Sequence, residues 1–330
     1  MGASTLIKVL KFDEAFYSGT SSMPRHILLG NGFSIKYFSY PSLLKASKIS
    51  GESSIGKLFD LLEITDFEIV IKALEDASVV DRAFQDSSDS KYQSSARQVR
   101  SYLIDAITKC HPQSHSSLGI QYADKFLSKF DKIFTVNYDI FLYWISLHGD
   151  RRFTDGFGKG LKINGFRRPF QKDAHCCTYF CHGGLHLFET EDRELEKIER
   201  INGKSLLQRI SETIENEHRY PVYVAEGSTE KKLSKIRSVP YLSHCLDELS
   251  RLEGELYIFG HSADTNDRHI YQAIFSSNVR KIYISVFRKT ANERRELFSN
   301  MEAHKIREGS EAKIFLFDAE SANVWGHVEE

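Results

Sequence analysis

The chain has 330 residues, enough to bury a large core, and its 41% hydrophobic and 27% charged residues are ordinary for a globular protein. Its formal net charge of −1, with the two signs interspersed, argues against direct sequence-specific binding of nucleic acid. The chain has no apolar run of membrane-spanning length, no signal peptide and five cysteines without framework spacing, so we expect a cytoplasmic protein without membrane association.

The pattern of apolar residues predicts helices and strands in alternation. Residues 4–17 have the period of a short amphipathic helix, and the apolar run at 26–29, which meets a glycine turn, is typical of a buried strand. From about 55 to 130 the pattern is helical, and we expect a helical insertion at about 37–128. Further strand-sized runs follow at 132–139, 178–183, 221–227, 255–262, 281–287 and 312–318.

Strands that alternate with helices predict an α/β fold, a Rossmann-like doubly wound parallel sheet with helices on both faces. We expect an N-terminal helical segment (1–24) and one catalytic domain (25–330) that carries the insertion. Residues of about 189–218 are rich in charges, which predicts a solvated helical excursion. Ligands of open parallel sheets bind beyond the carboxyl ends of the strands, so four strand ends are of interest.

The first strand end has the sequence Gly30-Asn31-Gly32-Phe33-Ser34. Two glycines one residue apart let the backbone turn tightly and approach a phosphate, whose charge the next helix N-terminus favours. Ser34 could cap that helix or donate a hydrogen bond to the phosphate. Ile35 stands where the dehydrogenase fingerprint has a third glycine, so hydride transfer fits poorly. A plain strand-to-helix turn explains the loop equally well.

The second and third strand ends carry polar side chains suited to catalysis. Asn137 offers a donor and an acceptor that would orient a ribose hydroxyl or a water. Asp139 is placed either to cap the next helix or to act in the site. His182 is followed by two glycines that open space beside it, and a neutral imidazole there could accept a proton. A structural histidine is the simpler alternative.

The fourth strand end lies at Gly260-His261-Ser262-Ala263-Asp264, ahead of Asp267 and His269. The glycine and the hydroxyl of Ser262 would let this loop meet a sugar or a phosphate. Capping of the following helix by Asp264 or Asp267 is the simpler explanation for these two carboxylates.

In order and in strand context, these segments resemble the sirtuin-like NAD-binding domain, and most closely a divergent bacterial branch associated with antiphage NAD depletion. The Gly30–Ser34 loop resembles that family's GAG-x-S phosphate loop, and Thr135–Asp139 resembles its T-x-N-x-D segment. His182-Gly183 is similar to its catalytic histidine–glycine pair, and Gly260–Ser262 to its ribose-binding G-x-S turn. Thr65-Asp66-Phe67-Glu68 resembles the Asp-Phe-Glu signature of the branch's helical insertion.

Two departures separate the chain from deacylating sirtuins. It lacks the paired C-x-x-C motifs of their zinc module, and the spacing of Cys176, Cys177, Cys181 and His182 does not suit a closed tetrahedral site. Val136 also replaces the glutamine common in deacylating sirtuins. We therefore expect no zinc, no cofactor beyond NAD⁺ as substrate, and water as the acceptor.

The resemblance implies a role for each strand end. The pyrophosphate of NAD⁺ would lie on the Gly30–Ser34 loop, and Asn137 would hold the nicotinamide ribose or the attacking water. His182 would act as general base, and Asp139 would support the nicotinamide-side loop or the developing positive charge. The ribose and adenosine contacts would come from Thr135, Ser262 and Ser285. The products would be nicotinamide and ADP-ribose.

Three functions are compatible with these residues. They are NAD⁺ hydrolysis by a bacterial antiphage effector, sirtuin-like deacylation or ADP-ribosylation, and non-catalytic sensing of NAD or ADP-ribose by an assembly subunit. Asn137 and His182 together favour an active enzyme. A toxic NADase must be restrained, so we expect a homo-oligomer with contacts through the insertion or the segment 4–17. The resemblance also implies a separate partner such as a HerA-like hexameric ATPase.

Overall fold

A computed structural model describes residues 7–17, 22–37, 40–65, 67–85, 91–112, 115–149, 153–157, 170–172, 176–190, 194–198, 203–217, 219, 221–224 and 229–326. In this part of the chain, one parallel sheet has seven strands. In sheet order they are β1 (Val9–Leu10), β10 (Lys313–Asp318), β9 (Asn278–Val286), β8 (Glu253–Phe259), β2 (Arg25–Leu29), β3 (Lys132–Thr135) and β4 (Thr178–Phe180). The predicted α/β fold with a parallel sheet is confirmed.

The order of the strands places a switch point at β2. From β2 the chain proceeds outward through β3 and β4 on one side, and through β8, β9 and β10 on the other. The loops after β2 and β8 therefore leave the carboxyl ends of two neighbouring strands in opposite directions. Doubly wound sheets bind their ligands in the crevice between two such loops.

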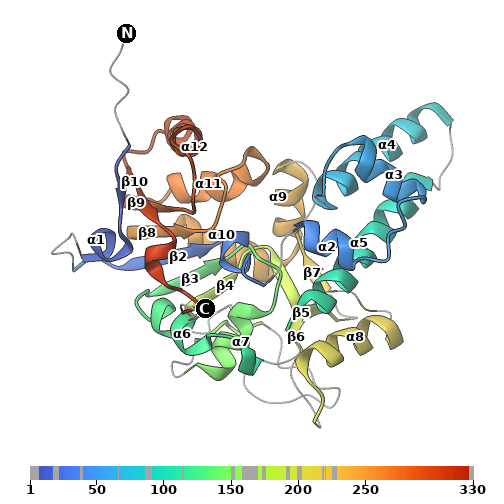
Figure 1. Cartoon of the computed structure of the whole chain (residues 1–330), viewed down its shortest axis with the longest axis horizontal. Coiled ribbons are helices and arrows are strands. Elements are labelled where there is room, and N and C mark those ends of the chain that lie inside the picture. The colour runs from blue at the N-terminus through green and yellow to red at the C-terminus, as the bar shows by residue number, and fades with distance from the viewer. Residues whose placement is uncertain are drawn as a thin grey trace.

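Helices cover both faces of this sheet (Figure 1). One layer consists, in order of contact, of α9 (Thr229–Ser238), α10 (Pro240–Ser250), α11 (Arg268–Phe275) and α12 (Ala291–Glu308). The opposite layer contains α1 (Phe12–Tyr17), α6 (Ile120–Leu127) and α7 (Phe141–His148). Within the described residues, no helix has the length and apolar character needed to span a membrane.

The N-terminal segment differs from the predicted helix over 4–17. Val9–Leu10 form β1, which pairs in parallel with β10, and the helix begins only at Phe12. The two phenylalanines of α1 are buried against aromatic rings of β8 and β10. A free edge of β10 offers backbone hydrogen bonds to any adjacent extended segment, and this pairing prevails over the helical period of the sequence.

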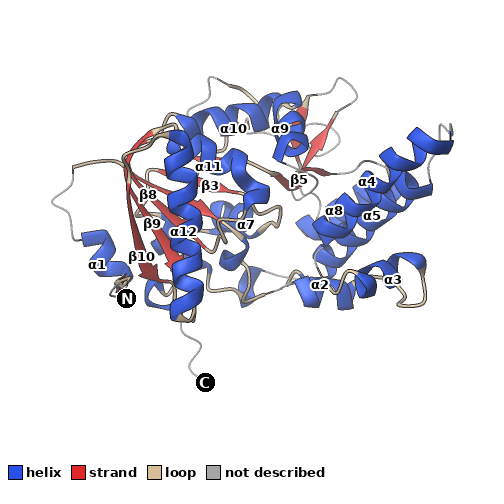
Figure 2. Cartoon of the chain, turned by 90° about the horizontal axis from the view of Figure 1, so that it is seen from above, coloured by secondary structure: helices blue, strands red, loops and turns tan. Residues whose placement is uncertain are grey.

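The described helices between β2 and α6 stand away from the sheet (Figures 1 and 2). They are α2 (Tyr40–Ala46), α3 (Ser54–Leu61), α4 (Phe67–Gln85) and α5 (Lys91–Cys110). The apolar stripes of α4 and α5 are buried because these two helices pack on each other and α2 packs on α5. Asp66, in the segment similar to the insertion signature, lies outside the described residues.

A small antiparallel sheet lies between the parallel sheet and these helices (Figure 1). Its strands, in sheet order, are β6 (Leu195–Lys197), β5 (Gly183–Glu189) and β7 (Pro221–Tyr223). The predicted strand at 221–227 therefore belongs to this second sheet. The predicted helical excursion at 189–218 is wrong in its first half, where Lys197 of β6 is buried and paired with Asp155. In its second half, α8 (Leu206–Asn216) is helical.

Candidate functional site

The loops after β2 and β8 touch through their backbones. The Gly30 N–H donates to the Phe259 carbonyl at 2.9 Å, and the Gly32 N–H donates to the Gly260 carbonyl at 2.8 Å. A Cβ atom added at Gly32 would lie 2.5 Å from the Cα of Gly260, whose own φ is +72°. Glycine at both positions thus has a structural cause, the close approach of two strand ends, in addition to any contact with a ligand.

A cleft of about 810 Å³ is lined by these loops. Five residues predicted to contact NAD⁺ line it, namely Gly32, Phe33, Gly260, Ser262 and Ser285. The lining also includes the aromatic rings of Phe287 and Trp325, the cations Lys36 and Lys289, and the ion pair of Arg288 with Glu320. Pockets for small molecules have volumes of roughly 300–1,000 Å³ and a few well-placed polar groups in a largely apolar wall. The size and lining of this cleft suit a small anionic molecule.

Three buried polar side chains connect the loops after β2 and β3. Asn137 donates through Nδ2 to the Gly30 carbonyl at 2.9 Å and to the Ser34 hydroxyl at 3.2 Å. The Ser34 hydroxyl in turn donates to Oδ2 of Asp139. The Oδ1 atom of Asn137 is buried without a hydrogen-bond partner among the described residues. Buried polar atoms in proteins are nearly always bonded, so we expect a water or a ligand atom at this oxygen. Asn137 is 3% exposed and is not among the residues that line the cleft, so a ligand would have to extend beyond that lining to reach it.

The other predicted residues of these two loops differ in their exposure. Ser34 is 1% exposed and its hydroxyl is engaged by Asn137 and Asp139, so it does not reach the cleft surface. Thr135 is also buried, and its Oγ1 accepts a hydrogen bond from the Asn137 N–H at 3.0 Å. Asn31 is exposed to solvent.

Asp139 lies one residue before the N-cap of α7, which is Ile140, and its two carboxylate oxygens have different partners. Its Oδ1 accepts from the Phe141 N–H at 3.0 Å, which holds the first turn of α7, while its Oδ2 belongs to the buried network. Burial raises the pKa of Asp139 from 3.8 to about 6, because desolvation of the carboxylate outweighs the hydrogen bonds that favour it. Asp139 therefore changes charge close to physiological pH.

His182 lies in a second buried group, which it forms with residues that follow β8. Its Nε2 is 2.9 Å from the Nε2 of His269, so one ring donates a proton and the other accepts it. Burial lowers the pKa of His182 well below 6.5 and that of His269 to about 4, so both rings are neutral at pH 7. A ligand hydroxyl can reach the Nε2 of His182 only if His269 releases it.

Asp267 joins this group, although the sequence suggested a helix cap. Its side chain makes no capping hydrogen bond. Instead, its Oδ1 accepts from the Nζ of Lys232 at 3.0 Å, and its Oδ2 lies 3.2 Å from the Nε2 of His261. Burial alone would raise the pKa of Asp267, but the bond to His261 and the nearby charges hold it well below 3.8. Asp264 does act as a cap, for the short 3₁₀-helix that follows it.

The sequence reasoning missed Lys232, His261 and His269 as members of one buried group. His261 and His269 stand close to Gly260 in the sequence, so the density of polar residues over 260–269 was a usable signal. Lys232 carried no such signal, because it lies on a charged helix and only the tertiary contact with Asp267 distinguishes it from its neighbours.

One group among the described residues has the geometry to hold a metal ion. Ligand atoms of His182, Asp267 and His269 lie within 4.8 Å of one another. The ammonium of Lys232, which is 3% exposed and bonded to the same carboxylate, opposes a cation there. The cysteines at 176–181 form no such group in the described part of the chain.

Elemental analysis of the purified protein is expected to find no stoichiometric zinc, because Lys232 already neutralises the Asp267 carboxylate. A chelator is accordingly expected to leave the melting temperature unchanged. One tightly bound metal ion per chain would contradict this prediction. Loss of that metal in His269→Ala would assign it to the histidine group, whereas its loss in Cys181→Ser would assign it to the cysteines.

Comparison with known proteins adds a family to this geometry. A search of curated proteins finds no match to the chain. A family profile described as "Domain of unknown function (DUF4917)" matches residues 27–325. The match extends from β2 to Trp325 of the cleft and includes the buried polar groups around Asn137 and around His182. The chain therefore belongs to the DUF4917 family.

Proposed function

We propose that this protein is a cytoplasmic NAD⁺ hydrolase that breaks the nicotinamide–ribose bond, and that it serves as a bacterial antiphage effector by depleting NAD⁺. The observation that carries the proposal is the buried amide of Asn137. Its nitrogen holds the Gly30 carbonyl of the loop after β2, while its oxygen lacks a partner among the described residues. A ribose hydroxyl or a water molecule would complete its hydrogen bonds.

The cleft supports binding of the ADP half of NAD⁺. The backbones of Gly32 and Gly260 lie in its wall, where the absence of side chains lets a pyrophosphate approach closely. Lys36 and Lys289 would balance the charge of the pyrophosphate, while Arg288 is paired with Glu320 at 2.9 Å. The order of these loops also resembles that of the sirtuin-like NAD-binding domain, as the sequence motifs suggest.

The reaction breaks the bond between ribose C1′ and the nicotinamide nitrogen, and the bonding electron pair leaves with neutral nicotinamide. Water adds to the oxocarbenium-like carbon and loses a proton. Asn137 would orient the ribose or the water, which lowers the entropic cost of reaching the transition state. The Asp139 carboxylate would stabilise the developing positive charge. His182 would accept a proton from a ribose hydroxyl or from water after its bond with His269 opens.

Turnover of NAD⁺ by the purified protein, with and without an acylated peptide, tests this function. A hydrolase is expected to release nicotinamide and ADP-ribose equally in both reactions. Release that requires the peptide and yields an acylated ADP-ribose would replace the proposal with deacylation, and ADP-ribose attached to the peptide or the protein would replace it with ADP-ribosyl transfer. Binding of NAD⁺ by calorimetry without any release would indicate a sensor subunit.

His182→Ala is expected to abolish nicotinamide release while ADP-ribose binding persists, because a base is needed for chemistry and not for binding. Calorimetry that shows loss of binding as well would indicate a structural histidine.

The turnover rate of the wild-type protein is expected to fall on acidification, with a midpoint near pH 6, because Asp139 then becomes protonated. Protonation of His182 itself would limit the rate only at much lower pH, since its pKa lies well below 6.5. A midpoint well below pH 6 would contradict the role given to Asp139.

The protein is proposed to work as a homo-oligomer, with a HerA-like hexameric ATPase as a further partner. The N-terminal helix is used within its own chain, which leaves the insertion as the contact surface. Val80 and Phe84, one turn apart on α4, are 57% and 85% exposed. Light scattering is expected to show an oligomer that Phe84→Glu disrupts, with the exposed Arg82→Glu as control. A wild-type monomer with full NADase activity would contradict this prediction.

A further inference from the structure

The order of the strands determines which half of a bound NAD⁺ each part of the cleft would contact. The described lining comes from the loops after β2, β8, β9 and β10. Asn137 and His182 follow β3 and β4, on the other side of β2, and neither belongs to this lining. With the pyrophosphate at Gly32 and Gly260 and the nicotinamide ribose at Asn137, the adenosine would therefore lie over the ends of β9 and β10.

An ion pair between two loops stands at this end of the cleft. Arg288 follows β9 and Glu320 follows β10, and both side chains line the cleft. The Nε and Nη2 atoms of Arg288 donate to the same oxygen, Oε1 of Glu320, at 3.0 and 2.9 Å. The other oxygen, Oε2, makes no hydrogen bond within the described residues, so it can accept one from a ligand hydroxyl.

The backbones of both residues are fixed for this pairing. Arg288 has a φ of +47°, a left-handed conformation that costs energy for any residue with a side chain. The N–H of Glu320 donates to Oδ1 of Asp318 at the end of β10, at 3.1 Å. Strained residues of this kind persist where the surrounding structure imposes them, and they concentrate at ligand sites. The position of Arg288 is thus imposed by the fold, although its side chain is 73% exposed.

The cations of the described lining leave little positive charge for a second phosphate group. They are Lys36, Arg288 and Lys289. Lys36 and Lys289 are the side chains that would balance the pyrophosphate, and Arg288 is paired with Glu320. NADP⁺ differs from NAD⁺ by a phosphate ester on the 2′-hydroxyl of the adenosine ribose, which adds about two negative charges. That ester would have to compete with Glu320 for Arg288 while it faced the displaced carboxylate.

The N-terminus of α12, which begins beside Lys289, does not favour such an ester either. Glu293 already occupies this helix end, where it accepts a hydrogen bond from the N–H of Thr290 at 2.7 Å in a capping box. The Glu293 carboxylate also interacts electrostatically with Lys289. A phosphate group near this helix end would meet a second carboxylate.

We propose that Glu320 makes the cleft selective for NAD⁺ over NADP⁺. Its Oε2 accepts a hydrogen bond from the 2′-hydroxyl of the adenosine ribose, and its charge repels a phosphate ester at that position. Carboxylates have this selective role in other dinucleotide-binding folds, where an arginine accommodates the 2′-phosphate. Arg288 orients the carboxylate and becomes the partner of a 2′-phosphate once the carboxylate is neutralised. This role rests on the proposed function, which places the adenosine at this end of the cleft.

Calorimetric titration of the full chain with ADP-ribose and with ADP-ribose 2′-phosphate measures the selectivity. These ligands are the products expected from NAD⁺ and NADP⁺, so neither contains the bond that the protein would break. The wild-type protein is expected to bind ADP-ribose about tenfold more tightly, the scale of a carboxylate that faces a doubly charged ester in water. Glu320→Gln is expected to tighten binding of the 2′-phosphate about tenfold, and the further change Arg288→Gln is expected to reverse that gain.

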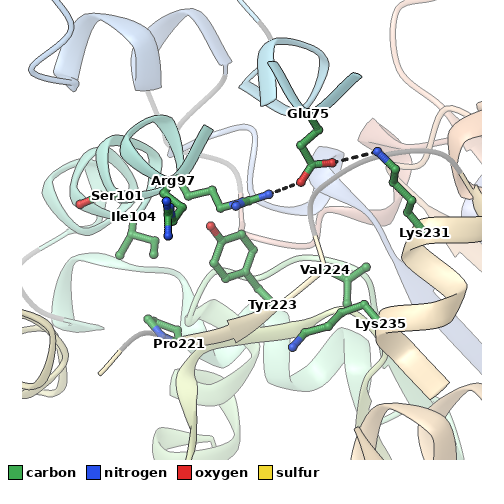
Figure 3. Close-up of a pocket in the computed structure, with 10 residues that line it drawn as sticks. Glu75, Arg97, Ser101, Ile104, Pro221, Tyr223, Val224, Lys231 and Lys235 are labelled. Atoms are coloured by element: carbon green, nitrogen blue, oxygen red, sulfur yellow. Dashed lines mark hydrogen bonds and ion pairs between the residues drawn. The ribbon is translucent and has the colours of Figure 1, made fainter. Parts of the chain in front are cut away.

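A carboxylate in a second pocket provides the matched control. This pocket, of about 490 Å³, lies where the helical insertion meets β7 and α9, and its lining is distinct from that of the cleft (Figure 3). Its Glu75 bonds to Arg100 and, at 3.3 Å, to Lys231, so Glu75→Gln also removes a carboxylate that is paired with an arginine (Figure 3). The ratio of the two affinities is expected to keep its wild-type value in Glu75→Gln.

The outcomes separate the role of Glu320 from the proposed hydrolysis. Equal affinity of the wild-type protein for the two ligands would overturn the selectivity. An unchanged ratio in folded Glu320→Gln, or the same gain in Glu75→Gln, would overturn the role of Glu320. Selective binding that Glu320→Gln abolishes, without any release of nicotinamide from NAD⁺, would refute the hydrolysis and leave the role of Glu320 standing. A folded protein that binds neither ligand would refute both.

Discussion

Asn137→Ala is expected to reduce nicotinamide release from NAD⁺ by at least about a hundredfold, because loss of positioning of a reacting group carries penalties of that size. The alanine removes both the open Oδ1 acceptor and the Nδ2 donor to Gly30. The loss of the buried donor leaves Gly30 and Ser34 without this bond, at a stability cost of about 1–3 kcal/mol. That cost is smaller than the stability of a typical domain, so the variant should still fold.

The comparison needs a control that removes an asparagine without touching the site. Asn278 is exposed and lies at the amino end of β9, whereas the candidate site lies beyond the carboxyl ends of the strands. Asn278→Ala is therefore expected to keep wild-type turnover. Nicotinamide release is measured by chromatography, and folding by circular dichroism and thermal melting. Near-normal turnover in a folded Asn137→Ala protein would remove the main support for the proposed function.

Acidification from pH 7 to pH 5 is expected to lower the free energy of unfolding by at least about 4 kcal/mol, to which the lowered pKa of His182 adds. Burial lowers the pKa values of His26, His111 and His269 to about 4, compared with 6.5 in the unfolded chain. Between the folded and the unfolded pKa values, the unfolded state binds more protons than the folded state. Each of these histidines therefore lowers the free energy of unfolding by about 2 kcal/mol at pH 5. Asp139 acts in the opposite direction, because its raised pKa makes the folded state the better proton acceptor. It offsets about 1 kcal/mol of the loss in the free energy of unfolding.

Urea denaturation at the two pH values measures this loss. His26→Gln is expected to remove about 2 kcal/mol of the difference, because the contribution of the lowered pKa of His26 is then absent. Equal free energies of unfolding at pH 5 and pH 7 would contradict the prediction and would indicate that these rings gain protons without unfolding.

The longer strands of the parallel sheet could be predicted from the sequence, since β3, β8, β9 and β10 coincide with continuous apolar runs. Strands β1 and β6 could not, because two or three residues carry no period and their conformation depends on a distant partner. Lys197 illustrates the point: a lysine in a charged segment suggests solvent exposure, and only the pairing with Asp155, 42 residues away, allows its burial.

The strand ends that build the candidate site were also predictable, because turn and polar residues follow each apolar run. The partners of the individual side chains were not. The contact of His182 with His269 spans 87 residues, and the link between Asn137 and Ser34 spans 103. The Asn137–Ser34 link follows from sheet order, which places β2 beside β3, whereas His182 follows β4 and meets His269 across two intervening strands. The roles proposed for these residues in NAD⁺ hydrolysis stay predictions until turnover is measured.

The main-chain contact between Gly32 and Gly260 has a consequence for how this fold can diversify. The spacing of the two walls of the cleft is set by carbonyl and amide groups that every sequence possesses, with no side chain between them. Mutations at the surrounding positions, such as Lys36, Phe287 and Lys289, can therefore alter ligand selectivity without altering the separation of the walls. A side chain at either glycine, by contrast, would collide with the backbone of the opposite loop and force the walls apart.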